Sequence, residues 1–99
     1  MVRTIRMTLN EGSEQAWTAA APAAIAAVSA IDGLDSYDSY RLDDGSWLEV
    51  LVWSDASLAN PGQAAAGDIA EVKKYWANIA TAEVSDGVLH ARNGVVATA

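Results

Sequence analysis

The chain has 99 residues, of which 52% are hydrophobic and 19% are charged, and this composition predicts one folded domain over residues 1–99. Its net charge of −7 disfavours nucleic acid and anionic membrane as partners, because both require clustered basic residues. With no cysteine and one histidine, the chain cannot form a disulfide and is poorly equipped for a transition metal, so we expect no metal site.

The N-terminal residues lack the apolar core of a signal peptide, and the alanine-rich run at residues 19–30 is too short and too weakly apolar to span a bilayer. We therefore expect a cytoplasmic protein.

The first two elements follow from periodicity. Residues 2–9 alternate in the manner of a strand, and Ser13 is the expected N-cap of a helix. Pro22 is predicted to kink or divide this helix, because proline lacks the N–H that an interior helical position needs. Asp32 and Gly33 close the segment. The buried stripe is predicted to contain Trp17, Ala20, Ala21, Ala24, Val28 and Ile31.

Residues 34–42 and 47–53 read as two strands joined by an Asp43-Asp44-Gly45 hairpin. The second of these strands is apolar on both faces, which a half-exposed sheet would not be. One face would be covered by the chain's own helices and the other by an identical partner. The sequence thus predicts a homodimer that pairs through the face bearing Leu48, Val50 and Val52.

After this strand, Ser54-Asp55 offers a cap for a short helical turn, and Asn60-Pro61-Gly62 is expected to break the chain. A longer helix is predicted to begin at Asp68, which has capping-box spacing to Glu71. Its stripe comprises Ile69, Val72, Trp76 and Ile79, and a last strand is expected over residues 82–92.

The element order is β-α-β-β-α-β, which predicts an α+β, ferredoxin-like domain with an antiparallel sheet. In this topology the strand order is 4-1-3-2, so the first and third strands are central neighbours. Both helices cover one face, which leaves the other face for the dimer partner and would complete a dimeric α/β barrel.

Four short motifs accompany this order: Asp32-Gly33-Leu34, Asp43-Asp44-Gly45-Ser46-Trp47, Val52-Trp53-Ser54-Asp55 and Leu89-His90-Ala91. With them the chain resembles the antibiotic biosynthesis monooxygenase-like family of dimeric α/β barrels. The resemblance implies several activities, since some members oxidise polycyclic phenols to quinones without metal or flavin, some degrade haem, and relatives with the same barrel cyclise polyketides.

The resemblance also points to particular residues. The quinone-forming members use a Trp at the end of the third strand, which Trp53 matches, and an Asn four residues earlier, where this chain has Glu49. The haem-degrading members need a His on the second helix. Residues 69–79 contain none, so we disfavour haem.

Glu49 shares its strand face with Trp47, Leu51 and Trp53, which would place a carboxylate in the pocket between helices and sheet. A buried carboxylate without a partner is costly, and Arg6 on the adjacent strand is the predicted partner. A catalytic role for Glu49 and Arg6 and a purely structural ion pair both remain open, as does a Glu49 that reaches water. His90 would suit proton transfer near neutral pH, or would be an ordinary strand histidine.

Four aromatic residues are predicted to bind substrate, with core packing as the alternative: Trp53, Tyr40, Trp17 and Trp76. The pattern does not fix which face of its strand carries Tyr40, and Tyr37 is an equal contender for the pocket. The leading hypothesis is a cofactor-independent monooxygenase-like enzyme for an aromatic or polyketide-type molecule. The alternatives are a non-oxidative cyclase or isomerase, and a small-molecule-binding accessory dimer without turnover.

Overall fold

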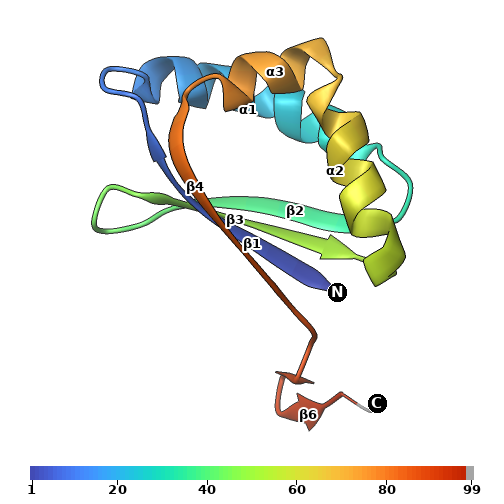
Figure 1. The fold of residues 1–99 in the computed structure, drawn as a ribbon. Coiled ribbons are helices and arrows are strands. Elements are labelled where there is room, and N and C mark those ends of the chain that lie inside the picture. Colours follow the sequence, from blue (N-terminus) through green and yellow to red (C-terminus); the bar gives the residue numbers. More distant parts are fainter. Residues whose placement is uncertain (98–99) are drawn as a thin grey trace.

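The computed structural model describes residues 1–97, which form a four-stranded antiparallel sheet with its helices on one face (Figure 1). The elements are β1 (Val2–Leu9), α1 (Glu14–Ser29), β2 (Leu34–Arg41), β3 (Trp47–Trp53), η1 (Ala56–Leu58), α2 (Ala59–Gly67), α3 (Ala70–Trp76), β4 (Ile79–Gly87), β5 (Ala91–Arg92) and β6 (Val95–Val96). The sheet order β2-β3-β1-β4 is the predicted one. The α+β, ferredoxin-like prediction is thereby confirmed.

Strand register determines which side chains meet the helices. In the β1–β3 pair Ile5 lies opposite Glu49, and Arg6 lies opposite Leu48. Residues of alternating parity point to opposite faces, so Ile5 and Glu49 belong to the inner face, against the helices. Arg6 and Leu48 belong to the outer face, where Leu48, Val50 and Val52 remain partly exposed.

The core lies between the inner face and the helices, and its largest members are aromatic. The Trp17 and Tyr75 rings stack at a centroid distance of 3.7 Å, which joins α1 to α3. The Trp17 indole also meets Trp47 edge-on at 5.9 Å. In a chain without Phe, the largest fully buried side chains are Trp17, Trp53 and Tyr75.

Proline and glycine do not break the helices where the sequence predicts. Residues 60–62 lie inside α2, because Pro61 falls in the first turn, where its missing N–H costs nothing. Gly62 is buried against Trp53, and a Cβ there would lie 2.2 Å from the indole Cη2. Pro22 does not divide α1, which is continuous, since buried Trp17 and Val28 on either side fix it to the core.

Two of the three predicted caps are in place, at Ser13 and Asp55, although only Asp55 makes a capping hydrogen bond with its side chain. The Asp55 side chain accepts a hydrogen bond from Ser57 N at 2.8 Å and so caps η1. Ser13 precedes α1 but makes no capping hydrogen bond with its side chain. The capping box at Asp68 is wrong, because α3 begins after Ile69 and ends at Trp76, which leaves Ile79 to start β4.

The last strand is shorter than predicted. β4 pairs with β1 from Ile79 to Gly87, where β1 has reached Val2 and offers no further partner. Residues 88–97, hereafter the C-terminal arm, extend away from the body of the domain and form the small β5–β6 hairpin (Figure 1). Its apolar side chains are exposed: Val88, Leu89, Val95 and Val96. No helix within residues 1–97 is long and apolar enough to cross a membrane.

Candidate active site

The inner face buries one carboxylate. Glu49 has no exposed surface, and two phenols enclose it. The Tyr37 hydroxyl, from the neighbouring strand β2, donates a hydrogen bond to Glu49 Oε1. The Tyr75 hydroxyl, from α3, donates to Oε2 at 2.7 Å. The carboxylate is therefore desolvated but satisfied, as a buried polar group must be.

Electrostatics in this cluster favour proton transfer to and from Glu49. Burial raises the pKa of Glu49 above its ordinary value, while the hydrogen bonds from Tyr37 and Tyr75 pull that pKa down. Burial and the carboxylate raise the pKa of both phenols, so Tyr37 and Tyr75 stay protonated and act as donors. A carboxylate with a raised pKa that retains two O–H donors has the chemistry of a general base.

An apolar cavity of about 310 Å³ lies on the same inner face, between β1, β4 and the helices. That volume lies at the lower end of the range for small-molecule sites. Its lining consists of Ile5, Met7, Gln63, Trp76, Ile79, Ala82 and Val84. Neither Glu49 nor its two phenol partners line it, but the lining residue Ile5 lies directly opposite Glu49 in the sheet. Burial and Glu49 raise the pKa of Tyr37, and Trp76, a lining residue of the cavity, lies close enough to Tyr37 to oppose that rise.

A buried cation lies on the same inner face. Arg3 is 7% exposed and binds Asp86 through Nε at 2.7 Å and Nη2 at 2.9 Å. Its Nη1 donates to Gln63 Oε1 at 2.6 Å, and Nη2 donates to Asn60 Oδ1 at 2.8 Å. The guanidinium thereby fastens α2 to β1 and β4, and its hydrogen bonds hold the pKa of Asp86 below the ordinary value.

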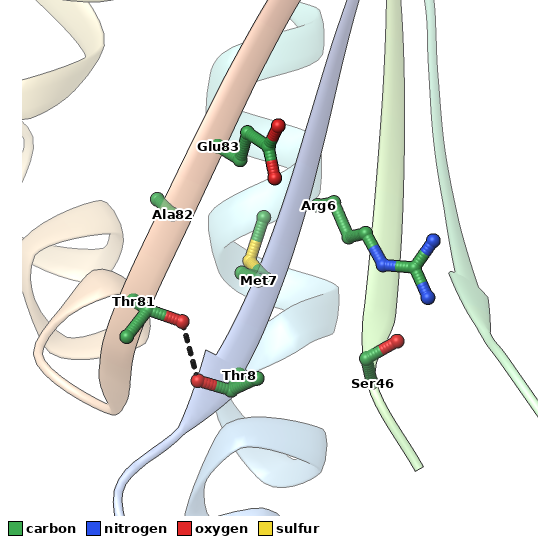
Figure 2. A pocket seen from close by; sticks show the side chains of 7 residues that line it. All are labelled: Arg6, Met7, Thr8, Ser46, Thr81, Ala82 and Glu83. Carbon is green, nitrogen blue, oxygen red and sulfur yellow. Dashed lines mark hydrogen bonds between the residues drawn. The ribbon is translucent and has the colours of Figure 1, made fainter. Parts of the chain in front are cut away.

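The predicted pairing of Arg6 with Glu49 is wrong. Arg6 projects from the outer face, one residue out of phase with Glu49, and its Nη2 binds Asp44 of the hairpin at 2.7 Å. Figure 2 shows Arg6 reaching across β3 on the rim of a second cavity, of about 340 Å³, with Ser46 and Glu83 nearby. Phenol hydroxyls, and not a cation, satisfy the buried carboxylate.

His90 does not approach the cluster. It lies in the C-terminal arm, beyond the end of β4, and lines a third cavity together with Met1, Val2 and Val52. The expectation that His90 lies on a strand that flanks the first strand is wrong, because β4 ends at Gly87, opposite Val2 at the start of β1. Within this chain, Glu49 and His90 are on separate sites.

The four aromatic residues predicted to bind substrate lie in different parts of the fold, and only one of them lines the apolar cavity. Trp76 lines the apolar cavity, whereas Trp17 is 1% exposed and serves the core. Trp53 is equally buried beneath Gly62, and its Nε1 has no hydrogen-bond partner in residues 1–97. Tyr40 lies opposite Leu48 on the outer face and is 50% exposed, so the inward-facing tyrosine of β2 is Tyr37.

The residues that sequence reasoning missed are Tyr75 and the Arg3–Gln63 pair. Tyr75 carried a weak signal, because it precedes Trp76 on an amphipathic helix that packs on the sheet. Arg3 had one too: it shares strand parity with Ile5 and Met7, which marks it as an inward-facing cation. No group of three or more His, Cys, Asp or Glu side chains gathers in residues 1–97.

Comparison of the sequence gives no match to any family profile, and no curated protein matches it. Solved structures do match. SnoaB, a cofactor-independent oxygenase from Streptomyces nogalater, here as an asparagine-to-alanine variant, superposes with a TM-score of 0.74 at 16% identity over 93% of this chain and 94% of SnoaB.

A candidate antibiotic biosynthesis monooxygenase from Bacteroides thetaiotaomicron VPI-5482 gives a TM-score of 0.71 at 13% identity, covering 94% of this chain and 91% of that one. Rv0793 from Mycobacterium tuberculosis gives 0.65 at 18% identity, covering 92% and 97%. The chain therefore has the fold of the antibiotic biosynthesis monooxygenase-like proteins, as the sequence motifs predicted.

Proposed function

We propose that this protein is a cofactor-independent monooxygenase that acts on an aromatic small molecule bound in the apolar cavity. The observation that carries the proposal is the pairing of that cavity with a fully buried carboxylate held by two phenols. Buried carboxylates with raised pKa values are enriched at active sites. The fold shared with SnoaB, a cofactor-independent oxygenase, supports the same reading by analogy.

Glu49 acts as the base in this proposal, and Tyr37 relays the proton. Tyr37 does not line the cavity, so the substrate has to reach it past Trp76, which lines the cavity and lies near Tyr37. A phenol or activated CH₂ group of the substrate then gives a proton to the Tyr37 oxygen while Tyr37 passes its own proton to Glu49. The cavity walls exclude water and leave the substrate anion poorly solvated, which favours its oxidation. Trp76 offers a flat surface against which an aromatic ring can stack.

Dioxygen is the only other reactant required. The substrate anion transfers one electron to dioxygen, and the two radicals combine to form a C–O bond in a hydroperoxide. The hydroperoxide then loses its remaining C–H proton as the O–O bond breaks, which leaves a carbonyl. One oxygen atom enters the product and the other departs as water with the proton returned from Glu49, so the CH₂ group supplies all four electrons.

One observation favours the binding protein without turnover as a second candidate. Glu49 is enclosed completely and both of its oxygens accept hydrogen bonds, so the cluster could serve stability alone. The variant of this idea in which Arg6 neutralises Glu49 is wrong, since the two side chains lie on opposite faces. A cyclase or isomerase would use the same base without dioxygen.

Oxygen uptake separates these functions. The purified protein, treated with chelator, is assayed with anthrones, naphthols and polyphenols. Protein-dependent uptake with one carbonyl formed per dioxygen consumed is the expected result. Conversion without uptake would support the cyclase or isomerase, and binding without conversion would support the accessory protein; either would contradict the oxygenase.

We further propose that two copies pair through the outer sheet face. Leu48, Val50 and Val52 are only partly covered there, and the adjoining C-terminal arm exposes four apolar side chains that the body of the domain leaves bare. A second copy would cover both sets reciprocally. Light scattering after size exclusion should give a dimer for the wild type and a monomer for Val50→Glu. A monomeric wild type would refute the pairing.

A further inference from the structure

Gln63 is the one polar side chain among the residues that line the apolar cavity, apart from the indole N–H of Trp76. It lies on α2 and is partly exposed. A lone amide in an apolar wall fixes the orientation of a ligand, because leaving a buried polar group unpaired is costly. The question is which end of the amide faces the ligand.

Arg3 answers it. The guanidinium has donors only, so the Gln63 atom that lies 2.6 Å from Arg3 Nη1 must be the carbonyl oxygen. Turning the amide over would place its NH₂ against the guanidinium N–H groups, two donors facing each other. Asp86 and Asn60 hold Arg3 itself in place through three further hydrogen bonds. The amide orientation is therefore locked by the network and does not depend on the ligand.

With its oxygen engaged, Gln63 has its Nε2 group left to donate, and no partner for that group lies within residues 1–97. Nε2 is also absent from the buried, unpaired polar atoms of this region, where Trp53 Nε1 alone is found. The group is therefore accessible, and the apolar cavity that Gln63 lines is the enclosed space into which it can donate.

We infer that Gln63 determines ligand specificity by presenting an N–H donor to the cavity, with Arg3 as its positioning residue. The cavity then selects aromatic or fused-ring molecules that carry an oxygen acceptor, a carbonyl or a phenolate, over the corresponding hydrocarbons. The inference rests on the proposed function only in taking this cavity as the ligand site. It adds the feature by which the ligand is recognised.

The test compares two bicyclic probes of nearly equal shape, 1-tetralone and tetralin, by calorimetric titration. One hydrogen bond predicts that the wild type binds 1-tetralone about tenfold more tightly than tetralin. Gln63→Glu keeps an oxygen on Arg3 but replaces the donor with a second acceptor, so the preference should vanish or reverse. Gln15→Glu, an exposed position on α1, changes the net charge equally and should keep the preference.

Equal binding of both probes by the wild type, or a preference that survives Gln63→Glu, overturns the inference and leaves the proposed oxygenase standing. Failure of both probes to bind overturns the inference together with the cavity on which the oxygenase depends. If the protein consumes no oxygen but loses its preference for 1-tetralone in Gln63→Glu, the proposed function alone is overturned.

Discussion

The hydrogen bond from Tyr37 to Glu49 gives a stability prediction that changes with pH. Tyr37→Phe removes the donor to Oε1 and leaves Tyr75 as the remaining partner of a carboxylate with no exposed surface. A hydrogen bond to an ionised group contributes about 1.5–3 kcal/mol, and one to a neutral group about 1 kcal/mol. The substitution should therefore cost more where Glu49 is ionised than where it is protonated.

The direction follows from the pKa of Glu49. Burial raises it above 4.5, so the stability that this group contributes is fully present below that value and is lost as pH rises through the folded-state pKa. The hydrogen bond from Tyr37 opposes this rise in pKa. Removing it moves the pKa of Glu49 further up, so Tyr37→Phe should lose stability more steeply than the wild type as pH increases.

A double-mutant cycle isolates the effect. Urea unfolding of the wild type, Tyr37→Phe, Glu49→Leu and the double variant is measured at about pH 5.5 and about pH 9, because leucine, unlike glutamine, cannot accept the Tyr37 hydrogen bond. Both pH values lie above the pI near 4.3, at which the protein is least soluble. We expect a coupling free energy of about 1 kcal/mol with Glu49 protonated and about 2 kcal/mol with Glu49 ionised, so the coupling should grow as the pH rises through the pKa of Glu49. A coupling below about 0.5 kcal/mol at both pH values would refute the buried hydrogen bond.

Two further stability predictions use matched pairs. Gly62→Ala should destabilise the protein by about 1–3 kcal/mol in urea unfolding, because the new Cβ would lie 2.2 Å from Trp53. Gly67→Ala is the control and should be neutral or stabilising, because its Cβ would lie at an ordinary 3.5 Å from Trp76. Equal effects of the two substitutions would contradict the packing of Trp53. Arg3→Ala should lower the urea midpoint clearly more than Arg6→Ala, because Arg3 is buried and makes four hydrogen bonds, whereas Arg6 makes an exposed ion pair with Asp44. The reverse order would refute the hydrogen-bond network that positions Gln63.

The sequence was most informative where burial follows a simple period. The alternation of β3 led to Glu49 as an inward-facing carboxylate, and the order of the elements along the chain led to the sheet order. The same alternation, carried to β1, was enough to place Arg6 on the outer face once Ile5 is set opposite Glu49. What the pattern lacked was the register between the two strands, and a shift of one residue exchanges the faces.

The partners of Glu49 were harder to predict because each depends on contacts distant in sequence. The choice between Tyr37 and Tyr40 turned on the register between β2 and β3, in which Tyr37 lies opposite Leu51 and Tyr40 lies opposite Leu48. Tyr75 comes from α3, whose packing against α1 is a tertiary property. Likewise Asn60-Pro61-Gly62 has the composition of a turn, and it joins a helix because Gly62 accommodates Trp53.

The rate of oxygen consumption in Glu49→Gln tests the central claim most directly. Glutamine can still bond both phenols through its oxygen and NH₂ but cannot accept the proton, whereas Glu71→Gln, exposed on α3, makes the same chemical change outside the site. With the substrate found by oxygen uptake, we predict a rate about 10²–10⁴-fold lower for Glu49→Gln and an unchanged rate for Glu71→Gln. Wild-type turnover in Glu49→Gln would contradict the account of Glu49 as the base.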